Sequence, residues 1–290
     1  MSDSATSTEI DWHPFTPRGV AGASLASRWQ LWVVLGVTAV LSTLMLLFFL
    51  TTCWTPVIRE AIDRLPDGGY VRGGMYYPGG TTSDLLLAEN RFLSAALRWR
   101  ERPAQDHAAD VRLTLQIDGL HACSLFGCAV ISYHSFGNVP LGRTETGAWW
   151  RAWHPAFLAA AVVIHLFVLV IVWWLLAVFH GWAIRMLGFY LDRQIDFAGA
   201  ARVAQAALVP GALWLTAALF FYTQGWLNLY GLIVVIVMHV PVGWVYAAAA
   251  CWHLPRRPDA AGSNPFHTEA EAEASAEAAP DNPFKSPPAP

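Results

Sequence analysis

The sequence predicts an α-helical integral membrane protein with four transmembrane helices in a one-plus-three arrangement. An exported, mostly β insert lies between the first and second helices. Four apolar stretches predict the helices, because crossing a bilayer takes about 20 residues. Only 13% of the 290 residues are charged, whereas a soluble domain has about 25%. The 15 tryptophans suit membrane interfaces, because the indole ring is apolar while its N–H is polar.

The first apolar stretch, residues 29–54, holds no charged side chain and is expected to be a retained transmembrane helix. A cleaved signal peptide is the alternative, but its apolar core spans only about 7–15 residues. Pro210 and Pro241 lie inside later stretches, where each is expected to kink its helix. The later stretches predict helices at residues 154–180, 203–222 and 227–252.

Arginines indicate the orientation in the membrane. They occur in residues 1–28, in the connection 181–202 and directly after the fourth helix, whereas the connection 223–226 has none. Positively charged short loops stay in the cytoplasm. Both termini are therefore expected in the cytoplasm of a bacterial inner membrane, with residues 55–153 exported. The connection 181–202 is expected to hold a cytoplasmic interfacial helix, because Trp182 and Phe189 can share an apolar face.

The exported insert is expected to be mostly β. Residues 111–117 alternate apolar and polar side chains, the pattern of a half-buried strand. Asp118-Gly119 then predicts a hairpin turn. Residues 85–99 fit either a helix or a strand. Further strands are predicted at residues 70–77, 120–126 and 129–133. The insert ends in a tryptophan cluster at residues 149–153 that suits a membrane interface. The tail, residues 258–290, lacks the apolar content for a core and is expected to be disordered.

His165 and His239 are the candidate cofactor-binding residues. Each lies near the middle of a predicted helix, and the two helices run in the same direction, so the imidazoles are expected at similar depth. Two facing imidazoles can ligate haem b or relay protons. In the simpler interpretation, which we favour, each histidine hydrogen-bonds a neighbouring helix and no cofactor is held.

Cys123 and Cys128 are the candidates for a disulfide, because an oxidising compartment permits one in the exported insert. A thiol–disulfide relay would need a second reactive pair. Cys53 stands alone, and Cys251 is expected on the opposite side of the membrane. We therefore expect either a structural disulfide or free thiols.

No motif predicts a reaction. The sequence has no Gly-rich phosphate loop, no His-x-x-x-His metal pair, no nucleophile elbow and no paired carboxylates within a span. No catalytic or metal-binding residue is therefore assigned. The net charge of −3 gives no reason to expect nucleic acid as a partner.

We expect a non-enzymatic protein that contacts the lipid bilayer and an envelope protein or a further copy of itself. Its role would be envelope organisation, sensing or assembly. One alternative is a membrane redox or b-haem protein that uses His165 and His239. The other is a subunit of a small transporter, which would have to oligomerise to form an ion pathway.

Five short motifs are spread over residues 12–255, at Leu65–Gly69, Ala109–Val111, Ser124–Gly127, Trp149–Trp153 and Val209–Leu213. With the order of the apolar stretches, they resemble a group of uncharacterised bacterial four-span membrane proteins. The chain is more distantly similar to maltodextrin-utilisation-type and Yip1-type membrane proteins. This resemblance implies the one-plus-three architecture and no particular activity.

Overall fold

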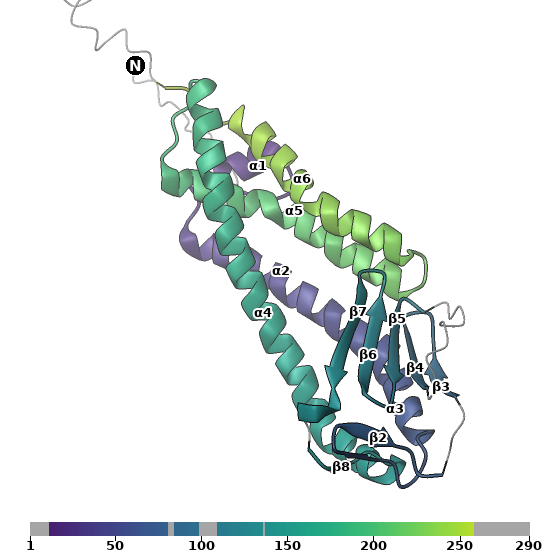
Figure 1. Ribbon diagram of the computed structural model, residues 1–290. Helices are drawn as coiled ribbons and strands as arrows, with labels where there is room; N and C mark the ends of the chain where they lie inside the picture. The colour runs from purple at the N-terminus through teal and green to yellow at the C-terminus, as the bar shows by residue number, and fades with distance from the viewer. Residues whose placement is uncertain (1–11, 81–83, 99–108, 136, 258–290) are drawn as a thin grey trace, which may run out of the picture.

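The computed structural model describes residues 12–80, 84–98, 109–135 and 137–257. In this part of the chain, four helices are long and apolar enough to cross a membrane, and two β-sheets lie between the first and second of them (Figure 1). The predicted arrangement of four long apolar helices and an inserted β region is confirmed. The predicted disordered tail lies outside the described residues.

The first long helix is a continuous rod with a π-helical turn inside it. Its first part, α2 (Arg28–Phe49), begins with a capping box between Ser27 and Gln30. The π-turn η1 (Leu50–Trp54) follows, and α3 (Thr55–Asp63) continues the rod. The irregular turn ends two residues before Pro56, which has no backbone N–H to donate.

The next helix, α4 (Arg143–Tyr190), has 48 residues and is therefore about 72 Å long, far more than a bilayer requires. It runs unbroken through Gly181, so the interfacial helix predicted at 181–202 is not a separate element. Gly181 serves close packing, because a Cβ there would lie 3.1 Å from the Cα of Ala201. The chain turns after Tyr190 at Asp192, whose φ is 55°, a region that Asp tolerates better than most residues.

The last two long helices, α5 (Phe197–Thr223) and α6 (Leu229–Cys251), form an antiparallel hairpin. Pro210 and Pro241, which were expected to kink their helices, lie inside α5 and α6, and both helices continue through them. Small residues bring the two backbones together: Gly211 faces the carbonyl of His239, and Gly243 faces Leu208. Figure 1 shows α5 lying between α6 and the other two long helices.

Replacing Gly211 by alanine is expected to destabilise this hairpin by about 1–3 kcal/mol. The added Cβ would press on the backbone carbonyl of His239, which cannot move without separating the helices. Thermal unfolding in detergent measures the loss. Gly36→Ala is the matched control, because a Cβ at Gly36 meets nothing within 4 Å. Equal melting of the two variants would contradict the prediction.

The short helix α1 (Pro17–Gly22) is buried at the end of the bundle away from the sheets. The hydroxyl of Thr16 caps it by accepting a hydrogen bond from the Gly19 N–H. Val20 is fully buried, and the guanidinium of Arg202 on α5 donates to the Ser24 carbonyl. The part of the N-terminal segment that follows residue 11 is therefore folded against the helices.

We call α3 and the two sheets the β domain (residues 55–142). Its strands are β1 (Tyr70–Arg72), β2 (Met75–Tyr77), β3 (Leu85–Glu89), β4 (Leu93–Leu97), β5 (Val111–Leu115), β6 (Gly119–Ser124), β7 (Gly127–Ser132) and β8 (Val139–Pro140). They form sheets of order β2-β1-β8 and β3-β4-β5-β6-β7. Only β4 and β5 pair in parallel among these strands. The stretch 85–99, which fitted a helix or a strand, contains β3 and β4.

The hairpin between β5 and β6 forms where it was predicted, but with a different turn. Its connecting residues are Gln116, Ile117 and Asp118, and Gly119 already pairs with Ser132 as part of β6. Gly119 has no positive φ; it is needed because a Cβ there would lie 2.8 Å from the carbonyl oxygen of Ile131. The same glycine thus serves close strand packing rather than turn geometry.

The core of the β domain forms between α3 and the sheets. Val57, Ala61 and Leu65 pack with the buried strand residues. Tyr76 and Tyr133 are also buried there, and burial raises the pKa of both hydroxyls above its ordinary value. Both tyrosines therefore stay neutral and act as apolar packing residues.

Candidate functional site: the joint between the β domain and the helices

The turn between β3 and β4 rests on the ends of the long helices, and we call this contact region the joint. Figure 1 shows the five-stranded sheet beside the ends of α2, α5 and α6. The turn residues are Asn90, Arg91 and Phe92. Their partners across the joint are Phe49, Cys53, Tyr222, Gly225 and Leu227.

Asn90 ties the turn to the π-turn of the first helix. Its Oδ1 accepts hydrogen bonds from the N–H groups of Phe92 and Leu93, each at 2.9 Å, so the side chain is fixed by its own turn. Its Nδ2 donates to the Cys53 carbonyl at 2.6 Å. A π-turn followed by Pro56 disturbs the regular ladder of helix hydrogen bonds. Asn90 supplies a donor at that irregularity.

Arg91 ties the same turn to the connection between α5 and α6. Its two terminal nitrogens donate to the carbonyls of Gly225 and Leu227, at 2.5 and 2.6 Å. Gly225 has a φ of 78°, a conformation that favours glycine. The guanidinium also lies just beyond the C-terminus of α5, where the helix dipole favours a positive charge.

Phe92 fills the centre of the joint. It is 8% exposed and meets Phe49 and Tyr222 edge to face, with ring centroids 5.6 and 4.9 Å apart. Phe49 in turn lies 6.1 Å from Trp54. Edge-to-face aromatic pairs add about 0.5–1.5 kcal/mol beyond the area they bury. One side chain of the β domain thus packs into a cluster built from the helices.

A further polar link closes the joint on the side of β5. The hydroxyl of Tyr222 on α5 donates to the Asp110 carboxylate at 2.6 Å. Asp110 is held in turn by its backbone, because its N–H donates to the Arg91 carbonyl at 3.0 Å. A hydrogen bond to a carboxylate is stronger than a neutral one. Tyr222 therefore links α5 to the β domain twice, through its ring to Phe92 and through its hydroxyl to Asp110.

Two contacts hold α4 to the β domain at its other side. The Arg143 guanidinium donates to both carboxylate oxygens of Asp67, at 2.6 and 3.2 Å. Directly after the π-turn, the Thr55 hydroxyl pairs with His154 Nε2 at 3.2 Å. The β domain is therefore attached to the long helices at several separate points and not through its chain connections alone.

The links that Asn90 and Arg91 make across the joint hold and orient the β domain. Asn90 and Arg91 cross it by donating to backbone carbonyls, which supply neither a nucleophile nor a base. In the described part of the chain, no group of three or more His, Cys, Asp or Glu side chains is placed to hold a metal ion.

The structure gives the two predicted histidines different partners. His165 Nε2 pairs with the Ser42 hydroxyl of α2 at 3.2 Å, and His239 Nδ1 lies 2.5 Å from the Ile236 carbonyl of its own helix. His165 thus pairs with a neighbouring helix, and His239 with its own. These contacts do not test the haem hypothesis, which stays a prediction.

The two predicted cysteines lie opposite each other in the β6–β7 hairpin, where the structure joins them in a disulfide. Ser124 and Gly127 close the hairpin, and Cys123 and Cys128 form the next pair along the ladder. This is a non-hydrogen-bonded pair, in which side chains approach most closely. Cys53 and Cys251 are buried and free. Cys53 lies in η1 and Cys251 ends α6, so the two thiols are on different elements.

Sequence reasoning missed the joint. Asn90-Arg91 stands between two apolar runs and is a turn signal, and Thr55-Pro56 marks an irregular helix position. Neither signal tells which surfaces meet, because Arg91 bonds carbonyls more than 130 residues away along the chain. No family model, no curated protein and no solved structure matches this chain.

Proposed function

We propose that this chain is a multi-pass protein of the bacterial inner membrane whose exported β domain binds protein partners of the envelope without catalysing a reaction. The four apolar helices support the membrane placement. Arg18, Arg28 and Arg185 lie at the end of the bundle away from the β domain, and this bias supports cytoplasmic termini.

The observation that carries the proposal is the outer strand β7. Among the described strands it ends the five-stranded sheet and pairs only with β6, and five of its six residues are exposed. Val130 and Ile131 are 53% and 48% exposed. Natural edge strands are usually protected by charges, proline or a bulge. β7 has neither a charged residue nor a proline.

The backbone of β7 is arranged to receive another strand. In the hairpin register, the residues that bond β6 alternate with residues whose N–H and C=O groups point away from it. Cys128, Val130 and Ser132 belong to the second set. An extended peptide can add to such an edge through backbone hydrogen bonds, while its alternate side chains provide specificity. An apolar, uncharged segment of an envelope protein fits this edge.

The joint gives this edge a fixed orientation. Because Asn90, Arg91 and Phe92 hold the β domain to the first long helix, to α5 and to the α5–α6 connection, β7 is presented in one direction relative to the membrane. A flexibly tethered domain would lose more freedom when it binds. The joint therefore serves the proposed function by pre-orienting the binding edge.

In-cell photo-crosslinking tests the proposal. A photoreactive amino acid in place of Val130 on β7 is expected to give a discrete adduct with an envelope protein. The matched control is Met75 on β2, which is 50% exposed but lies in the other sheet. The absence of an adduct at Val130, or the same adduct at both positions, would refute binding at β7. An adduct of twice the chain mass would identify a second copy as the occupant.

The orientation gives a separate prediction. Phe126→Cys, at the 81% exposed tip of the β6–β7 hairpin, is expected to react with a membrane-impermeant thiol reagent in cells whose outer membrane has been made permeable. Phe189→Cys, near the far end of α4, is expected to react only after the inner membrane is opened. The native thiols give a low background, because Cys53 and Cys251 are buried. The reverse labelling pattern would contradict cytoplasmic termini.

A further inference from the structure

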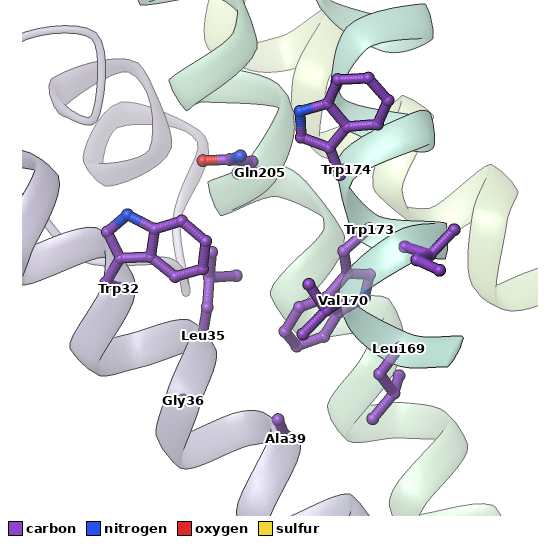
Figure 2. Close-up of a pocket in the computed structure, with 10 residues that line it drawn as sticks. Trp32, Leu35, Gly36, Ala39, Leu169, Val170, Trp173, Trp174 and Gln205 are labelled. Carbon is purple, nitrogen blue, oxygen red and sulfur yellow. The ribbon is translucent and has the colours of Figure 1, made fainter. Parts of the chain in front are cut away.

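A cavity of about 250 Å³ opens between α2, α4 and α5, in the half of the bundle away from the β domain. Three tryptophans stand around it, Trp32 on α2 and Trp173 and Trp174 on α4 (Figure 2). Gly36 lies on its floor, and a Cβ there would meet nothing within 4 Å. The cavity is therefore apolar, and a missing side chain on α2 widens it.

Among the described residues that line this cavity, Gln205 has the one amide side chain. Figure 2 shows its amide between Trp32 and Trp174. Within the described residues, this amide makes no hydrogen bond. An amide without a partner is costly in an apolar medium, and polar side chains inside a membrane commonly mark a binding site. The cavity thus combines an apolar chamber with an unused polar group at its rim.

A positive charge lies close to the same rim. Arg28 is four residues before Trp32, so the two share one face of α2 one turn apart. Arg28 is exposed, and no ion pair holds it within the described part of the chain. Lipid headgroups with a negative charge attract basic residues at the cytoplasmic surface.

We propose that this cavity holds one acyl chain of an anionic glycerophospholipid from the cytoplasmic leaflet. The acyl chain of the lipid fills the space over Gly36. Its glycerol ester region accepts a hydrogen bond from the Gln205 amide, and its phosphate lies near Arg28. The membrane environment argues for this occupant, because acyl chains surround the cavity there while water is excluded. The inference rests on the membrane placement proposed above but not on the protein partner.

Native mass spectrometry of the delipidated full chain in detergent tests the site, with phosphatidylglycerol and phosphatidylcholine of identical acyl chains as probes. The wild-type chain is expected to retain one phosphatidylglycerol at a roughly tenfold lower lipid concentration than phosphatidylcholine. Gly36→Leu fills the chamber and is expected to abolish that preference and the tight binding. Val37→Leu is the matched control, because Val37 is on the same helix and 56% exposed outside the cavity.

Two further variants separate the parts of the proposal. Gln205→Leu is expected to weaken binding of both lipids, whereas Arg28→Gln is expected to remove only the preference for phosphatidylglycerol. Melting temperature shows that each variant is folded. Wild-type binding by a folded Gly36→Leu chain, or equal binding of both lipids by the wild type, would overturn the proposal. Because no protein partner is present, a failed crosslink at Val130 leaves this result unaffected.

Discussion

Replacing Phe92 by alanine is expected to destabilise the protein by about 3–5 kcal/mol, because it empties the centre of the joint. The ring is 8% exposed and contacts aromatic rings from two different helices, Phe49 and Tyr222. Those helices are held by other contacts and cannot close on the space. Denaturant unfolding in detergent, followed by tryptophan fluorescence, measures the loss, and Trp54 beside Phe49 reports on the same region.

The control for this prediction is Phe126→Ala. It removes the same ring from the tip of the β6–β7 hairpin, where the side chain is 81% exposed. Its effect on stability is expected to stay within about 0.5 kcal/mol. If both variants unfold at the same denaturant concentration, Phe92 does not anchor the β domain and the joint is only a surface contact.

Composition and periodicity predicted individual helices and strands but not the joint that connects them. The four apolar helices follow from the length of the apolar stretches, and β5, β6 and β7 follow from short-range alternation and turn residues. Each of these signals lies within one element. The residues of one short segment are therefore enough to predict the helix or strand that they form.

The structure departs from the predictions where contacts with a distant part of the chain determine the local conformation. Gly181 and Gly119 were expected at a helix boundary and at a turn, but each allows the close approach of a distant backbone. Helix α4 likewise begins at Arg143, directly after the β domain, although the apolar stretch that predicted it begins at residue 154. Such information is spread over pairs of residues far apart in the sequence.

Asn90→Leu is expected to cost more than an ordinary surface substitution, because it leaves three backbone groups without their partner. These are the N–H groups of Phe92 and Leu93 and the Cys53 carbonyl. A buried group left unpaired costs about 1–3 kcal/mol, so the combined loss is expected to exceed that of Gly211→Ala. Denaturant unfolding measures it under the conditions used for Phe92.

Asn90→Asp separates the two functions of the side chain. Aspartate keeps an oxygen that accepts from the turn, so the β3–β4 hairpin is expected to form. It loses the donor to Cys53 and brings a carboxylate towards a carbonyl oxygen, so only the link to the π-turn is broken. Hydrogen exchange is expected to rise at η1 and at the α5–α6 connection while β4 and β5 stay protected. If exchange rises equally throughout the β domain, Asn90 stabilises the domain itself and not its attachment. If exchange does not change, the π-turn holds its conformation without the β domain, and the orientation of β7 must depend on Arg91 and Phe92 alone.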